Sequence, residues 1–241
     1  SALTKKKKKK FLKLYKSLQE SALINVQRGS PLSKHENSFF QDLTKHRTLE
    51  NFDPQAIAKS YEEAGATCIS VLTETEFFLG SPNYIKSVKA ACSLPVLRKD
   101  FILDDYQIFE SKLIGSDCIL LIAAILDISD LHRLYKLAIS LDLDVLVEVH
   151  NSEELDKVLT LAPSMIGINN RNLNSFDLNL DVTIDLVEKI PSDVLVVTES
   201  GIKTRVHIEK MLSHGVYGFL IGEALMANAD PGLALSQLTS F

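Results

Sequence analysis

No apolar run in this 241-residue sequence approaches the ~20 residues that a membrane-spanning helix needs. Cysteine is scarce, and its odd count of three and its spacing predict neither a disulfide framework nor a metal site. The formal net charge of −5 provides no basic excess of the kind that nucleic-acid-binding domains carry. We therefore expect a cytoplasmic protein with reduced, buried cysteines, no metal, and neither nucleic acid nor membrane as its partner.

The basic residues are concentrated in one place, a run of six lysines at residues 5–10. Apolar residues at helical spacing follow between positions 11 and 18, without the apolar core and cleavage site of a signal peptide. This pattern predicts a solvated tail and a short amphipathic helix within residues 1–20. The alternative is that the lysines attract an anion or an acidic membrane.

Short runs rich in Val, Ile and Leu alternate with helical patterns along the chain. The apolar runs are residues 22–26, 68–72, 95–97, 118–122, 145–149, 165–168, 194–197 and 217–221. The helical patterns cover residues 54–64, 83–91, 106–114, 131–140, 153–161, 182–189, 205–213 and 224–238. Near-continuous apolar runs are typical of parallel strands that are buried on both faces.

Eight strand–helix units in one chain predict an α/β fold, a (β/α)8 TIM barrel with a short extra N-terminal helix. No linker rich in Pro, Gly or Ser interrupts the sequence, so residues 1–241 are expected to form one domain. The alternative is a doubly wound open sheet. Such a sheet usually has a glycine-rich phosphate motif after its first strand, and this sequence has none there.

Polar residues follow the apolar strands at the ends where barrels carry their active sites. Lys99, Glu148 and Glu199 are charged residues within or directly after buried runs, where an unpaired charge is costly. The structural alternative is an ion-pair layer that caps the core. Both signs of charge converge on the functional face, which favours a catalytic site.

Glycines after the last two predicted strands indicate a ligand. Gly201 and Gly222 begin short segments that lead into helices, where backbone N–H groups can bind phosphate. Phosphate sites in these two loops are frequent in barrels. The pattern predicts a sugar phosphate or a similar anion as the ligand.

Several longer segments resemble the indole-3-glycerol phosphate synthase family, in the family's own order. They are ISVLTE at 69–74, FFLGS at 77–81, LPVLRKDFI at 94–102, LVEVH at 146–150, GINNRNL at 167–173, ESGI at 199–202 and GFLIGEALM at 218–226. The resemblance implies a lyase of tryptophan biosynthesis that needs no cofactor. Its substrate would be 1-(2-carboxyphenylamino)-1-deoxyribulose 5-phosphate, which closes to an indole with loss of CO2 and water.

The resemblance also assigns catalytic roles. It implies that Lys99 protonates the substrate ketone during ring closure and that Glu148 transfers protons during dehydration. Asn169 would orient the substrate by hydrogen bonding. Glu199 and Ser200 would line the end of the seventh strand.

Binding roles follow from the same resemblance. Phosphate would be held by Ser30 and by the backbone at Gly201, Gly222 and Glu223. Phe101 would supply an apolar wall for the aromatic ring, although it could equally be an ordinary core residue. Association with other enzymes of the tryptophan pathway is a further hypothesis.

The predicted first strand departs from the family pattern. Asn25 and Gln27 stand where family members usually have Glu and Lys. The resemblance implies that these two residues contact the substrate, and that Arg171 does so as well. The amides keep hydrogen-bonding capacity but cannot titrate, and each lost acid–base group typically costs ~10²–10⁴-fold in rate. Two functions therefore stay open: an active synthase, and an impaired barrel of this family that binds a phosphorylated ligand or a protein partner.

Overall fold

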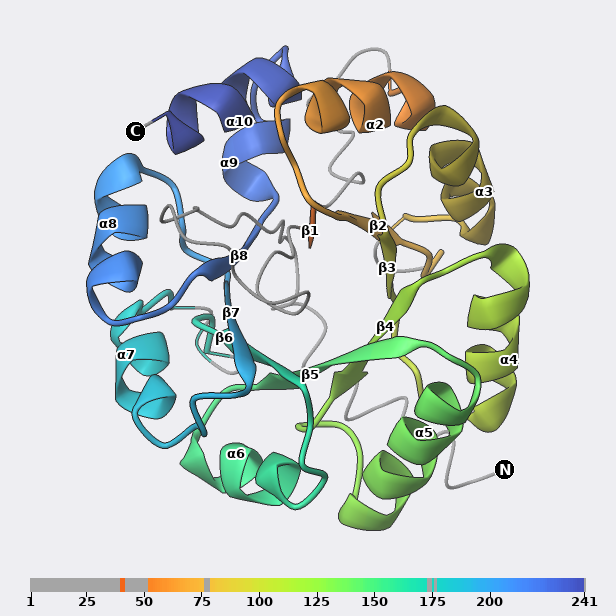
Figure 1. The fold of residues 1–241 in the computed structure, drawn as a ribbon, viewed down its shortest axis with the longest axis vertical. Coiled ribbons are helices and arrows are strands. Elements are labelled where there is room, and N and C mark those ends of the chain that lie inside the picture. The colour runs from red at the N-terminus through yellow and green to blue at the C-terminus, as the bar shows by residue number, and fades with distance from the viewer. Residues whose placement is uncertain (1–39, 42–51, 76–78, 173–174, 176, 241) are drawn as a thin grey trace.

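The computed structural model describes residues 40–41, 52–75, 79–172, 175 and 177–240. Eight parallel strands form one sheet in the order β1-β8-β7-β6-β5-β4-β3-β2. The strands are β1 (Phe40–Gln41), β2 (Ile69–Leu72), β3 (Val96–Lys99), β4 (Cys118–Ile122), β5 (Asp144–Val149), β6 (Met165–Asn169), β7 (Leu195–Glu199) and β8 (Gly218–Ile221). Figure 1 shows the sheet curled at the centre of the molecule with the helices around it.

The helices that surround the sheet alternate with the strands along the chain, as the sequence predicted. They are α2 (Pro54–Glu63), α3 (Pro82–Ala91), α4 (Asp105–Ile114), α5 (Ile128–Ser140), α6 (Ser152–Leu159), α7 (Asp181–Val187), α8 (Arg205–Ser213), α9 (Glu223–Met226) and α10 (Pro231–Thr239). Side-chain caps begin most of them; Asp104, for example, accepts a hydrogen bond from the backbone N–H of Tyr106. Gly115 ends α4 at φ 94°, a left-handed conformation that glycine adopts without strain.

The parallel α/β fold is confirmed, with two differences from the prediction. The strand predicted at residues 22–26 lies outside the described residues, and the strand that pairs with β8 is Phe40–Gln41, in the predicted loop. Two residues are too few to stand out as an apolar run. The single helix predicted for residues 224–238 is wrong: α9 ends at Met226, and α10 begins anew at Pro231 with Asp230 as its N-cap.

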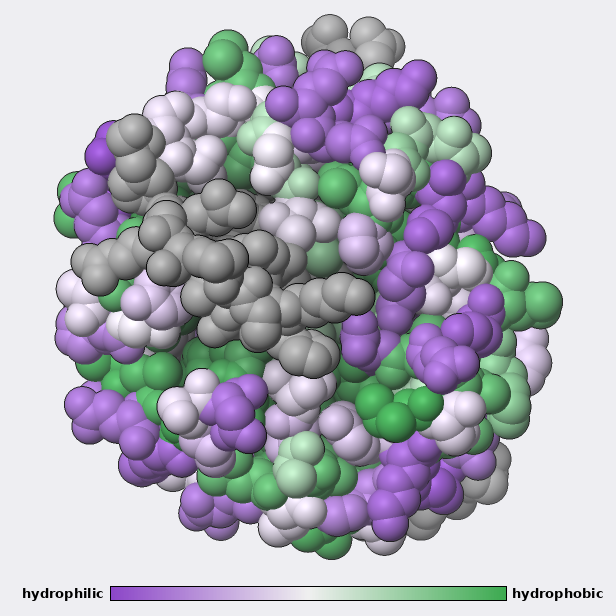
Figure 2. Space-filling model, viewed as in Figure 1, coloured by the Kyte–Doolittle hydropathy of each residue, from purple (hydrophilic) through white to green (hydrophobic). Residues whose placement is uncertain are grey.

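The core has two parts because the strands are buried on both faces. The larger cluster packs the outer face of the sheet against the helices. The smaller cluster fills the inside of the curl and includes Leu72, Leu97, Leu146 and Leu220. Figure 2 shows hydrophilic residues mainly around the rim of the molecule. In the described part of the chain, every helix is too short or too polar to span a bilayer.

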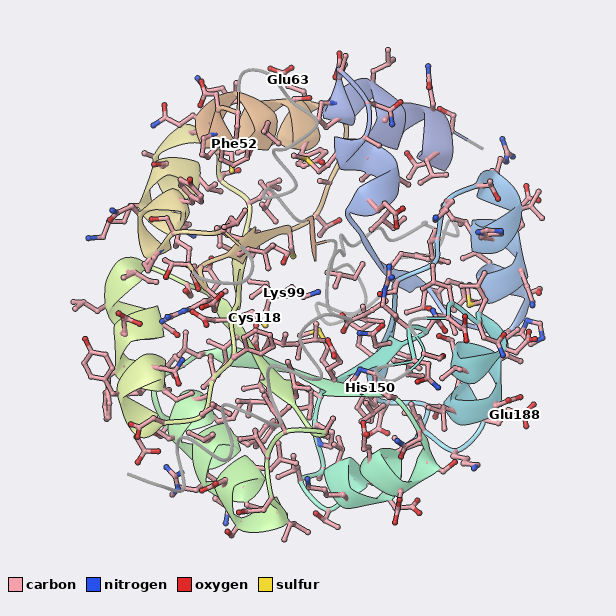
Figure 3. All side chains as sticks on the ribbon, turned by 180° about the vertical axis from the view of Figure 1, so that it is seen from behind. Phe52, Glu63, Lys99, Cys118, His150 and Glu188 are labelled. Atoms are coloured by element: carbon pink, nitrogen blue, oxygen red, sulfur yellow. The ribbon has the colours of Figure 1, made fainter. Side chains whose placement is uncertain are left out.

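None of the three cysteines, all of which lie in the described part of the chain, forms a disulfide. Cys68 and Cys118 are buried in the inner cluster, as predicted, and Figure 3 shows Cys118 near the middle of the ring. Cys92 is only half-buried, because it caps the exposed end of α3 rather than lying in a strand. The prediction of burial is therefore wrong for this cysteine.

Candidate active site

Four polar side chains from four strands converge at the carboxyl edge of the sheet. Lys99, Asn169 and Glu199 are the last residues of β3, β6 and β7, and Glu148 is the penultimate residue of β5. All four are buried, and Lys99 points toward the centre of the ring of strands (Figure 3). Strand register sets the arrangement, because Asn169 lies opposite Glu199 in the parallel pairing.

Charges of both signs lie close together in this group. Lys99 Nζ is 3.6 Å from Glu199 Oε2, and Asn169 Nδ2 donates to Glu148 Oε1 over 3.3 Å. The second oxygen of Glu148 and both oxygens of Glu199 have no hydrogen-bond partner among the described residues. Buried carboxylate oxygens without partners are rare in a structural core, and they are typical of a site that receives a polar ligand.

Gly167 creates the space for Glu199. A Cβ atom at position 167 would lie only 2.1 Å from Glu199 Oε1 and 3.3 Å from Leu146 Cδ1. Because Gly167 has no side chain, the Glu199 carboxyl group can lie close against the backbone of β6.

His150 joins the site, although the sequence analysis assigned it no role. Its Nε2 lies 3.1 Å from Glu148 Oε1, an ion-pair contact without good hydrogen-bond geometry, and its Nδ1 lies 3.0 Å from Glu154 Oε2. The ring is almost fully buried. The signal in the sequence was a histidine two residues after Glu148, on the same face of a strand and four residues before a second acid.

The surroundings of Glu148 and Glu199 shift the pKa values of these two carboxyl groups in opposite directions. Burial acts to raise the pKa of Glu148, but the close contact and charge of His150 and the charge of Lys99 outweigh it and lower the pKa. Burial and the charge of Glu148 raise the pKa of Glu199 to about 8. At neutral pH Glu148 is therefore ionised and Glu199 is protonated, which places a base and an acid side by side.

A buried network fixes the end of β3, from which Lys99 projects. The Arg98 guanidinium donates to Asp100 over 2.8 Å and to Glu110 of α4 over 2.6 Å, and Asp100 accepts a bond from the Thr73 hydroxyl. The network ties β3 to the end of β2 and to α4. By holding the end of β3, the network restricts the backbone that carries Lys99.

The turn after β7 is held by another side chain that the sequence analysis missed. Ser200 and Gly201 both have positive φ, 62° and 86°. Asn170 Nδ2 donates to the backbone carbonyls of Glu199 and Ser200, over 2.9 and 3.0 Å. Asn170 Oδ1 accepts bonds from the backbone and the hydroxyl of Thr183 on α7. The amide thus fixes the strained turn in place.

A small, partly open pocket lies between the ends of β7 and β8. Five residues with predicted roles lie along it: Arg171, Ser200, Gly201, Gly222 and Glu223. The Glu223 carboxylate lies 3.8 Å from Arg171 Nη2 and 3.3 Å from Lys203 Nζ. Two cations therefore offset the charge of this carboxylate at a pocket predicted to receive an anion.

The predicted site residues thus fall into two neighbouring groups. Lys99, Glu148, Asn169 and Glu199 form the inner group, and the pocket residues form the outer one. Phe101 is buried in the inner apolar cluster. The predicted residues Asn25, Gln27 and Ser30 lie outside the described residues. Among the described residues, no group of His, Cys, Asp and Glu is placed to hold a metal ion.

Comparison with known proteins identifies the family. The family model for indole-3-glycerol phosphate synthase matches residues 8–238. The chain is 54% identical over 188 residues to an indole-3-glycerol phosphate synthase of Polaromonas naphthalenivorans, covering 78% of this chain and 72% of the relative. It is 53% identical over 189 residues to that of Albidiferax ferrireducens, covering 78% and 72%. The chain belongs to the indole-3-glycerol phosphate synthase family.

Solved structures show how widely the fold of this synthase family is shared. The 3-hexulose-6-phosphate synthase of Salmonella typhimurium aligns with a TM-score of 0.67 at 16% identity, covering 83% of this chain and 95% of that one. The N-acetylmannosamine-6-phosphate 2-epimerase of Clostridium perfringens aligns at 0.63 and 14%, covering 81% and 93%. At such low identity the likeness shows the fold alone.

Proposed function

We propose that this protein is an indole-3-glycerol phosphate synthase that closes the indole ring of 1-(2-carboxyphenylamino)-1-deoxyribulose 5-phosphate. The observation that carries the proposal is the convergence of Lys99 with an ionised and a protonated carboxyl group in one buried site. Ring closure with loss of CO2 and water requires groups that donate and accept protons, and no redox chemistry.

The residue roles follow from this arrangement. Lys99 donates a proton to the ketone oxygen while the aromatic carbon attacks, and Asn169 hydrogen-bonds the substrate beside it. CO2 then leaves from the ring carbon that made the attack, and the electron pair of the broken bond returns to the ring and restores its aromaticity. Glu148 then accepts the proton that must leave during dehydration, and the protonated Glu199 assists the departing hydroxide.

The outer pocket suits the substrate phosphate. The turn at Ser200 and Gly201 and the backbone at Gly222 and Glu223 line it, and Arg171 and Lys203 add positive charge. Backbone N–H groups in such turns favour anions. Phe101 would form the apolar wall beside the aromatic ring.

The remaining proposals concern the N-terminal part of the chain. β1 and β2 end the strand order and contact each other, which supports a closed (β/α)8 barrel. The single domain and the short N-terminal helix are proposed from the sequence pattern alone. We further propose that Asn25, Gln27 and Ser30, which precede β1 in the sequence, contact the substrate and its phosphate. We also propose a cytoplasmic location and association with other tryptophan-pathway enzymes.

The test is indole fluorescence after the purified protein is mixed with the substrate. The wild type should form product, Lys99→Ala should lose most of this activity, and Lys136→Ala, an exposed lysine on α5, should keep it. Product formation that survives in Lys99→Ala would overturn the assignment of this lysine.

A second candidate function rests on Asn25 and Gln27, which replace the Glu and Lys expected at these positions. The chain would then be an impaired family member that binds a phosphorylated ligand or a protein. A wild type without product, rescued by the double variant Asn25→Glu, Gln27→Lys, would establish this alternative.

A further inference from the structure

We propose that His150 is a positioning residue for Glu148, and that Glu154, on the helix after β5, holds His150 in that role. The proposal deepens the proposed function, because it rests on Glu148 acting as the base. It assigns a catalytic effect to Glu154, a residue that contacts none of the reacting groups.

The contacts of the imidazole ring point to a bridge between two carboxylates. One ring nitrogen lies 3.1 Å from Glu148 and the other lies 3.0 Å from Glu154. A neutral imidazole carries only one N–H, whereas the protonated ring has two donors. Because each ring nitrogen lies within ion-pair distance of a carboxylate and the side chain is only 7% exposed, the arrangement favours the charged ring.

Glu154 is itself fixed on both oxygens. Its Oε2 accepts the backbone N–H of His150 over 2.8 Å, and its Oε1 accepts the Asn151 side chain over 2.9 Å. Asn151 in turn caps α6 by accepting the backbone N–H of Glu154. The ring therefore cannot rotate away from Glu148 without breaking its contact with a carboxylate that is itself held on both oxygens.

The surrounding charges support the bridge. Besides Glu148 on its own strand and Glu154 from α6, Glu199 of β7 interacts with the charge of His150, and Lys99 of β3 interacts with both Glu148 and Glu199. With Glu199 protonated, two cations balance two carboxylates, which limits the cost of burying them.

Protonation of His150 should therefore persist into alkaline solution. Burial acts to lower the pKa of His150, but the close contacts and charges of Glu148 and Glu154 raise it to about 10. Removing the negative charge of Glu154 lowers this pKa, so the ring becomes neutral at a lower pH. Glu148 then loses the cationic partner that aims it, and turnover falls on the alkaline side.

The test uses Glu154→Gln, which keeps the size of the side chain, with Glu153→Gln as the matched control. Glu153 is an exposed acid in the same first turn of α6, so both variants change the helix terminus by the same charge. We would measure kcat and KM between pH 6 and 9.5, and follow His150 by NMR titration of its ring carbon in the protein without substrate.

In Glu154→Gln we expect kcat to fall about tenfold at pH 9 and less than about twofold at pH 6, since one pKa unit is a factor of ten. KM should stay nearly constant, and His150 should lose its proton at a lower pH than in the wild type. A structural role alone would lower kcat equally at every pH. Glu153→Gln should behave like the wild type.

Two results would overturn the inference: a pH profile of Glu154→Gln that superposes on that of Glu153→Gln, or an unchanged titration of His150. If the wild type forms no product, the synthase proposal fails instead. The titration then decides the bridge by itself, because it needs no substrate: a lower pKa in Glu154→Gln supports the bridge and an unchanged one refutes it.

Discussion

Replacing Gly167 by alanine should disable the site through one short contact. The added Cβ would lie 2.1 Å from Glu199 Oε1, whereas real Cβ contacts are essentially never shorter than 3.0 Å. The carboxyl group must therefore retreat by at least about 0.9 Å. Because Glu199 is fully buried and Leu146 Cδ1 lies on the other side at 3.3 Å, neither group can give way freely.

The size of the effect follows from this displacement. Overpacking a tight core typically costs about 1–3 kcal/mol of unfolding free energy. A misplacement of about 1 Å at a reacting group costs about 10²-fold in rate. We therefore expect Gly167→Ala to lower kcat about 100-fold and to destabilise the protein by about 1–3 kcal/mol, because Glu199 moves relative to Lys99 and Glu148.

The assay combines urea unfolding with steady-state indole formation, in a double-mutant cycle with Glu199→Ala. Removing the Glu199 side chain removes the atom with which the new methyl group collides. Gly167→Ala should therefore destabilise the Glu199→Ala background much less than the wild type. The reasoning is refuted if Gly167→Ala unfolds at the wild-type urea concentration with wild-type kcat, or if the two substitutions are additive.

Two further variants test other parts of the site. Asn170→Ala removes the side-chain donor that the buried Ser200 carbonyl accepts, while the Glu199 carbonyl keeps the Asn170 backbone N–H and the Thr183 hydroxyl keeps Thr198. Urea unfolding should therefore show a loss of about 1–3 kcal/mol, and KM should rise as the turn at Ser200 loosens; an unchanged KM would contradict the positioning of this turn. Glu199→Gln should alter the pH dependence of stability. The folded pKa of Glu199 is raised to about 8, so the folded state binds the extra proton between the unfolded pKa and pH 8, and stability falls as pH rises through that window. Wild type should therefore lose stability relative to Glu199→Gln between pH 5 and pH 8, and parallel unfolding curves would contradict the assignment.

Most of the sheet could be predicted because parallel strands buried on both faces leave continuous apolar runs. Each of the strands β4 to β8 begins and ends within two residues of the corresponding predicted run. β1 could not be found in this way, because a strand of two residues has no pattern and depends on its pairing with β8. The division between α9 and α10 was readable in principle from Asp230 and Pro231, an N-cap followed by a proline.

The inner group of residues was predictable because a charged residue within an apolar strand is costly to bury unless it is paired or has a function. Lys99, Glu148 and Glu199 therefore stood out in the sequence. His150 and Asn170 did not, since their importance depends on partners that the fold supplies: Glu154 across the start of α6, and two carbonyls of the neighbouring strand end.

The proposed mechanism depends most directly on Glu148 being the base that accepts a proton during indole formation. The decisive measurement is kcat of Glu148→Gln with the carboxyphenylamino-deoxyribulose phosphate, followed by indole fluorescence beside the wild type. We predict a fall of about 10²–10⁴-fold with KM changed less than about twofold, because glutamine keeps the size and cannot accept the proton. Turnover by Glu148→Gln within a few-fold of an active wild type would contradict the account.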